Sequence, residues 1–123
     1  MEKKEMCMSK VDIKVIIKNN DEVSEEKYVA LKNKQKIEYF EKEFKTSLFL
    51  KDVVKIKREN EDYLFDMEFI PDKETKGMCK LKKENAIIDL KILTDYVIIE
   101  ENVIIIKYKV LTTEQDVVFK LEM

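Results

Sequence analysis

The segment Tyr63-Leu64-Phe65-Asp66-Met67-Glu68-Phe69 decides the fold class, because its aromatic and thioether side chains fall on odd positions and its acids on even ones. A period of two places alternate side chains on opposite faces of a strand. The same alternation recurs in short segments from Val11 to Leu121, separated by polar turns such as Asn19-Asn20-Asp21. The sequence therefore predicts an all-β protein, with an antiparallel sheet closed into a barrel or folded into a sandwich.

The length of 123 residues fits one domain. We expect residues 1–9, which are charged and rich in sulfur, to be disordered or loosely ordered. Residues 10–123 show neither a long loop nor a second unit. They are therefore predicted to form the whole β-domain.

The stretch Ile37–Leu50 fits two kinds of secondary structure. Ile37, Phe40 and Phe44 recur at the spacing of one helix face, and the many lysines and glutamates also favour a helix. The alternation and composition of residues 44–50 are instead typical of a strand. From these residues alone we favour two strands, with a helix as the alternative.

The composition argues against several classes of function. Basic and acidic residues number 24 and 26, for a net charge of −2, so the chain lacks the basic excess of nucleic-acid-binding domains and polybasic membrane anchors. It has no histidine, a single arginine, Arg58, and a single glycine, Gly77. Histidine bases, histidine metal ligands, arginine clusters and glycine-rich nucleotide loops are therefore missing. We expect no enzyme, no metal, no cofactor, and neither nucleic acid nor membrane as a partner.

Two cysteines, Cys7 and Cys79, are too few to staple a small secreted domain. No apolar run precedes Cys7, which predicts that there is no signal peptide or lipid-anchor leader. No stretch approaches the roughly 18 consecutive apolar residues of a membrane-spanning helix. We therefore expect a cytoplasmic, soluble protein with reduced thiols, in which Cys79 is a small buried hydrophobe.

Several motifs follow one another in a definite order: Ile37-Glu38-Tyr39-Phe40-Glu41, Thr46, Arg58, Phe69 before a loop, Asp89-Leu90-Lys91-Ile92-Leu93-Thr94 and Ile106-Lys107-Tyr108. Their order and spacing resemble the YwiB-like family, small bacterial β-barrel proteins of unknown function with a calycin (lipocalin-like) topology. The resemblance implies two strands over Ile37–Leu50 and a single antiparallel β-barrel of about 8–10 short strands. It implies no activity. The family's turns that contain proline or glycine correspond here to Lys83-Glu84-Asn85-Ala86 and Arg58-Glu59-Asn60, which contain neither.

Five residues are the candidate ligand-binding residues. Glu41 and Arg58 share strand parity with apolar neighbours, and charges that point into a barrel must be paired or close to water. We expect them to meet at one barrel mouth and anchor a ligand carboxylate or hydroxyl; the alternatives are a structural salt bridge or two unrelated rim charges. Tyr39, Tyr63 and Tyr108 also have inward parity, and would line a ligand pocket or belong to an ordinary core.

Two functions remain open from the sequence. The first is a carrier or sensor that binds one small apolar or amphipathic molecule, which requires a cavity above roughly 300 Å³. Bulky inward residues such as Ile17, Phe65 and Phe119 argue for a mostly filled barrel. The second is a structural or protein-interaction module, in its simplest form a homodimer through the apolar segment Tyr96–Ile106. An enzyme using only carboxylates and tyrosines ranks lowest, because no convergent set of acids faces inward.

Overall fold

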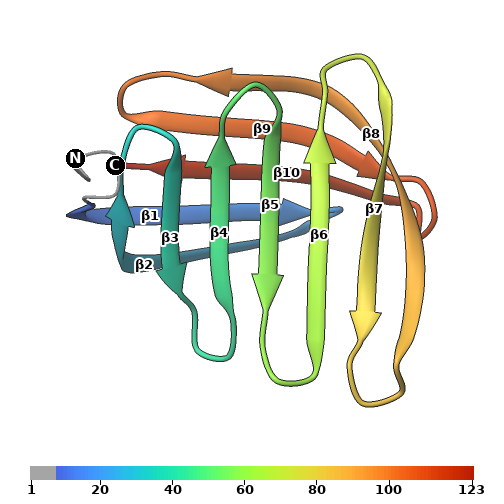
Figure 1. Cartoon of the computed structure of the whole chain (residues 1–123). Coiled ribbons are helices and arrows are strands. Elements are labelled where there is room, and N and C mark those ends of the chain that lie inside the picture. The colour runs from blue at the N-terminus through green and yellow to red at the C-terminus, as the bar shows by residue number, and fades with distance from the viewer. Residues whose placement is uncertain (1–7) are drawn as a thin grey trace.

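The computed structural model describes residues 8–123, and every regular element in that range is a β-strand (Figure 1). The predictions for Cys7 and for most of the N-terminal segment lie outside the described residues. No helix within residues 8–123 is long and apolar enough to cross a membrane. The strands are β1 (Ser9–Asn19), β2 (Glu22–Lys32), β3 (Lys36–Phe40), β4 (Lys45–Leu50), β5 (Val54–Glu59), β6 (Tyr63–Phe69), β7 (Glu74–Leu81), β8 (Ala86–Ile99), β9 (Val103–Val110) and β10 (Gln115–Glu122).

The strands form a closed antiparallel barrel in the order β1-β10-β9-β8-β7-β6-β5-β4-β3-β2. Each strand pairs with its neighbour in the chain, and the pairing of β1 with β10 closes the barrel, with Val15 opposite Leu121. The prediction of a single antiparallel barrel is confirmed, as are the two strands over Ile37–Leu50. Closure leaves no open sheet edge, so none of the short strands exposes unpaired backbone groups to another chain.

The barrel is flattened into two layers, with β3–β7 crossing β1, β9 and β10 at a steep angle (Figure 1). Strand β8 passes from one layer to the other. Its first half pairs with β7 and its second half with β9, and the register shifts between Thr94 and Tyr96. A bulge of this kind bends and twists a strand, which lets β8 turn the corner. Strand β2 forms the opposite corner, because it pairs with β1 along its length but with β3 only from Ala30 to Lys32.

Side chains fill only one half of the barrel. The filled half is packed by buried apolar side chains that include Ile13, Val15, Ile37, Leu48, Ile92, Ile104, Ile106 and Leu121. In the other half the inward side chains of the same strands border open space. The expectation of a mostly filled barrel is therefore wrong for this half. The sequence shows the bulk of the inward side chains but not the separation of the two layers, and here the side chains do not span it.

Gly77 is needed for close packing on the inner face of β7. A Cβ at this position would lie 2.9 Å from the Cδ1 atom of Ile92 and 3.0 Å from the carbonyl oxygen of Asp66. Both distances are shorter than ordinary van der Waals contact, and the second involves backbone that cannot easily move. The single glycine of the chain therefore allows β7 to approach its neighbours without a clash.

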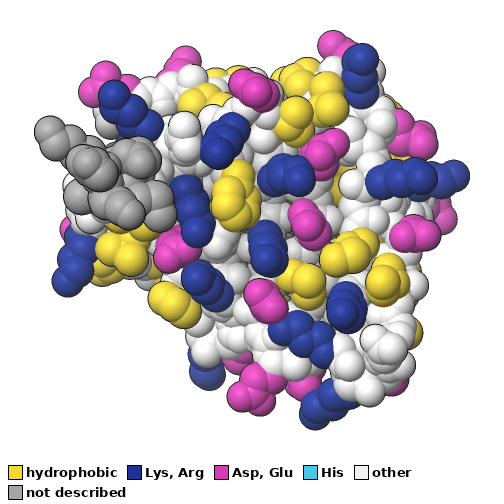
Figure 2. All heavy atoms as spheres, viewed as in Figure 1, with side chains coloured by type: hydrophobic (Ala, Val, Ile, Leu, Met, Phe, Trp, Pro, Cys, Tyr) yellow, Lys and Arg dark blue, Asp and Glu magenta, His cyan; other side chains and the backbone are white. Residues whose placement is uncertain are grey.

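The outer surface carries interspersed charges of both signs, together with some apolar side chains (Figure 2). On the β8–β9 hairpin, Ile104 and Ile106 are buried, whereas Tyr96 and Ile98 are 38% and 37% exposed. The hairpin contains the apolar segment Tyr96–Ile106, which the sequence suggested as a dimer surface. In the single chain it has one buried and one exposed face, because the barrel covers only its inner side.

Candidate functional site

A cavity of about 440 Å³ occupies the unfilled half of the barrel. Most of its wall is apolar, and its charged lining consists of one acid and one base. No cluster of three or more metal-binding side chains occurs among the described residues. The lining residues are Ile17, Asn19, Tyr39, Glu41, Thr46, Ile56, Arg58, Phe65, Met67, Cys79, Ile88, Leu90, Tyr108, Val110, Thr113, Gln115, Val117 and Phe119.

The charged lining is a paired unit of Glu41 and Arg58. The Arg58 Nε and Nη2 atoms donate to the two carboxylate oxygens of Glu41, at 3.2 Å and 3.1 Å. The hydroxyl of Thr46 donates to the same carboxylate. The guanidinium also lies over the ring of Phe44, 4.5 Å from its centroid, in a cation–π contact. Glu41 and Arg58 meet at the barrel mouth, as expected, and their role in anchoring a ligand stays a prediction.

Strand register explains how these groups come together. Tyr39 of β3 lies opposite Thr46 of β4, and Thr46 lies opposite Arg58 of β5. Three neighbouring strands thus present the three side chains in one row on the inner face. Glu41 directly follows β3, so its carboxylate can reach back over the row. The side chains of Arg58 and Glu41 remain 35% and 18% exposed, which places them at the mouth rather than in the core.

Two tyrosines of the lining are deeply buried. Burial, followed by the nearby Glu41 carboxylate, raises the pKa of Tyr39 well above its usual range. Tyr28 stacks on Tyr39 with ring centroids 5.0 Å apart. Burial also raises the pKa of Tyr108 to about 12, while the positive charge of Arg58 opposes the rise. Both phenols therefore stay neutral at physiological pH and offer hydroxyl groups to the cavity.

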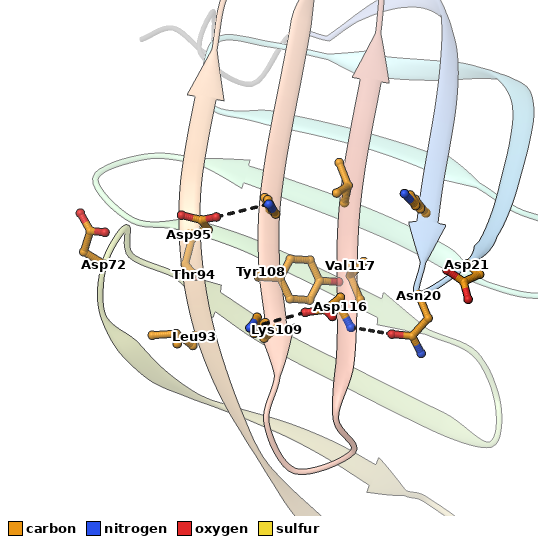
Figure 3. A pocket seen from close by; sticks show the side chains of 13 residues that line it. Asn20, Asp21, Asp72, Leu93, Thr94, Asp95, Tyr108, Lys109, Asp116 and Val117 are labelled. Atoms are coloured by element: carbon orange, nitrogen blue, oxygen red, sulfur yellow. Dashed lines mark hydrogen bonds and ion pairs between the residues drawn. The ribbon is translucent and has the colours of Figure 1, made fainter.

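The hydroxyl of Tyr108 has no hydrogen-bond partner among the described residues. The residue is 7% exposed and lines the cavity. Its ring packs against Phe69, with centroids 4.6 Å apart, and its strand position lies opposite Val117 (Figure 3). The hydroxyl oxygen is not among the buried polar atoms without a partner, so it is accessible from the cavity and can bond to water or to a ligand there.

The far rim of the cavity is polar but uncharged. Gln115 donates to the side chain of Asn19 at 3.4 Å and accepts from the hydroxyl of Thr113 at 2.6 Å. These residues come from the end of β1 and from the turn between β9 and β10, where Glu114 has a left-handed φ of 53°. Cys79 lies in the wall between the rims, and burial raises the pKa of its thiol. The cysteine is buried, as expected.

The structure places four of the five candidate residues in the cavity lining: Tyr39, Glu41, Arg58 and Tyr108. Tyr63 is not part of it. Tyr63 is 40% exposed and stacks on Phe65 with centroids 6.2 Å apart. The parity of Tyr63 is inward, but it is the first residue of β6 and lies beyond the cavity wall.

Sequence reasoning did not select the polar groups of the far rim, Asn19 and Gln115, as site residues. The alternation of β1 continues from Ile17 to Asn19, and that of β10 runs back from Val117 to Gln115. Extending both patterns by two residues would have found them. Because both residues are polar and adjoin predicted turns, the sequence indicated turn positions rather than a cavity lining.

A larger depression of about 1020 Å³ lies over β8, β9, β10 and the β1–β2 turn (Figure 3). Four of its charged side chains form two ion pairs, with Lys107 3.5 Å from Asp95 and Lys109 3.9 Å from Asp116. Asn20 accepts a hydrogen bond from the backbone of Asp116 at 2.9 Å. The wall of this depression is nearly as polar as it is apolar, whereas the interior cavity has the mostly apolar wall that is typical of small-molecule sites and contains four of the candidate residues. The interior cavity is therefore the candidate site.

Comparison with solved structures places the fold beside the YwiB protein of Bacillus subtilis, known from its crystal structure. The TM-score is 0.65, the alignment covers 97% of this chain and 96% of that one, and 16% of the residues are identical. The chain therefore has the fold of a small closed β-barrel like that protein. At this identity the likeness concerns the fold alone. No family model and no curated protein matches the sequence.

Proposed function

We propose that this protein is a cytoplasmic carrier or sensor that binds one small apolar or amphipathic molecule inside the barrel. The observation that supports the proposal best is the cavity of about 440 Å³. Ligand pockets in proteins span roughly 300–1,000 Å³ and have mostly apolar walls with a few polar groups. The cavity combines an apolar wall with the Glu41–Arg58 pair at its mouth, so it can accept an apolar body and orient a polar end.

The connectivity supports the same function. An up-and-down antiparallel barrel is the architecture of lipocalins, which hold one small ligand in the lumen. The calycin-like topology implied by the sequence resemblance agrees with this proposal. We propose no catalytic role, since the only charged side chains of the lining, Glu41 and Arg58, neutralise each other.

Native mass spectrometry of the protein purified from its own cells tests the proposal. A reproducible extra mass that disappears under denaturing conditions is the expected result. The matched variants are Leu90→Trp, which adds bulk to the cavity wall, and Ile87→Trp, which adds the same bulk to an exposed outward position. The extra mass should be lost from Leu90→Trp and retained by Ile87→Trp. A bare mass for the unaltered protein contradicts the proposal.

A second candidate function is self-association through Tyr96–Ile106. It is favoured by the outer side of β8, where Tyr96 and Ile98 are 38% and 37% exposed. A homodimer would cover these side chains with a second copy. Light scattering at high micromolar concentration tests this candidate. A dimer that Ile98→Lys converts to monomer supports it, and a strictly monomeric protein argues against it.

A further inference from the structure

The charge of the cavity mouth is balanced before any ligand binds. Arg58 uses two of its five N–H groups on Glu41, and within residues 8–123 no other charged side chain belongs to the lining. An ionic ligand would meet attraction from one member of the pair and repulsion from the other. It would also lose its hydration on entering an apolar lumen, with little net charge to compensate for the loss. The geometry therefore disfavours a carboxylate or an ammonium at this position.

Hydrogen-bonding capacity, by contrast, is left unused at two places in the lining. Arg58 retains N–H groups with no protein acceptor among the described residues, and these can donate to an oxygen atom. The Tyr108 hydroxyl, which makes no hydrogen bond with the described residues and is accessible from the cavity, can donate or accept. Both residues line the same cavity. A ligand oxygen in the cavity can therefore bond to either group without displacing a protein partner.

We propose that the ligand is an uncharged amphipathic molecule, of the chemical class of medium-chain alcohols and esters, whose oxygen is bound by Arg58 or Tyr108 and whose chain lies against the apolar wall. The inference rests on the proposed binding function and names the ligand class. A volume of about 440 Å³ corresponds to roughly 15 water molecules. A medium-length chain of about ten carbons with one polar end therefore fits.

Three probes with the same chain and different charge test the proposal: decan-1-ol, decanoate and decyltrimethylammonium. Each is titrated into the unaltered full-length protein at neutral pH, and affinity and location are followed by amide and methyl chemical shifts. Decan-1-ol should bind at least about tenfold more tightly than either ion, with shifts confined to the cavity lining. This comparison needs no variant, so it does not depend on any substitution being tolerated.

Charge variants then test the reason for the preference. Glu41→Gln leaves Arg58 without its counter-ion, so decanoate should become the tightest of the three probes. Arg58→Gln leaves Glu41 without its counter-ion, so decyltrimethylammonium should bind more tightly than it does to the unaltered protein. The double variant should restore the preference for decan-1-ol. Glu59→Gln is the matched control, because Glu59 is ion-paired to Lys82 at 2.7 Å outside the cavity lining, and it should leave the order unchanged.

The hydroxyl of Tyr108 is tested separately by Tyr108→Phe. This change should weaken decan-1-ol binding several-fold and leave the affinities of the two ions unaltered. Decanoate or decyltrimethylammonium binding to the unaltered protein as tightly as decan-1-ol overturns the charge argument while leaving ligand binding in place. Failure of all three probes to bind overturns both this inference and the proposed function.

Discussion

The Glu41–Arg58 pair makes a quantitative prediction about stability. Its two N–H···O contacts of 3.1 and 3.2 Å are charge-assisted, and both side chains are partly buried. Fully exposed pairs contribute about 0–1 kcal/mol, and breaking a buried pair costs about 3–5 kcal/mol. We therefore expect an intermediate coupling energy of about 2 kcal/mol between the two side chains. The cation–π contact of Arg58 with Phe44 does not enter this value, because it is lost equally in both arms of a double-mutant cycle.

The cycle comprises the unaltered protein, Glu41→Gln, Arg58→Gln and the double variant. The free energy of unfolding of each is measured by urea denaturation followed by far-ultraviolet circular dichroism, with the m value checked for constancy. A parallel cycle on Asp62 and Lys83 is the control: this pair has a similar contact of 3.1 Å, but its side chains are 44% and 76% exposed. Its coupling should not exceed about 1 kcal/mol. Equal coupling in the two cycles would refute the view that partial burial strengthens the cavity pair.

Three further predictions concern single positions. Gly77→Ala should lower the free energy of unfolding by about 1–3 kcal/mol, and Ile92→Val should recover part of this loss in urea denaturation, because it removes one of the clashing atoms. Since the pKa of Tyr108 rises from 10.0 to about 12 on folding, its neutral form stabilises the native state below about pH 10. The free energy of unfolding should therefore fall by roughly 2–3 kcal/mol between about pH 10 and 12. The Tyr108→Phe variant should lack this decrease, and a variant with the same pH profile as the unaltered protein would contradict the prediction. In a Cys7→Ser background, iodoacetamide should alkylate Cys79 about tenfold more slowly than free cysteine at about pH 8, because burial raises the pKa of the thiol. The alkylation rate is measured by mass spectrometry. Equal rates for Cys79 and free cysteine would contradict the prediction.

Local patterns predicted the strands well where alternation was regular. The segment Tyr63–Phe69 is strand β6 with the expected first residue, and the two strands proposed within Ile37–Leu50 are β3 and β4. The helical spacing of Phe40 and Phe44 was misleading, since Phe44 lies between the strands and packs over Arg58. Parity also brought Glu41 and Arg58 to one face, because neighbouring strands share a pleat.

Depth along the barrel could not be predicted from parity. Tyr63 and Tyr108 both have inward parity, yet Tyr63 is exposed beyond the wall and Tyr108 is buried beside the cavity. The difference depends on how far each residue lies from the rim once all strands are in register. Register across β1, β9 and β10 joins residues about 100 positions apart in the chain, such as Asn19 and Gln115, and no local pattern reports it.

The sequence by itself determined the all-β class, the positions of the strands and the face to which each side chain belongs. These follow from a period of two, which is a property of a few neighbouring residues. Only the tertiary structure decided that the sheet closes through β1 and β10, that the bulge between Thr94 and Tyr96 turns β8 between layers, and that one half of the lumen stays open. Closure and cavity volume depend on the separation and crossing of layers, which are set by contacts between distant segments.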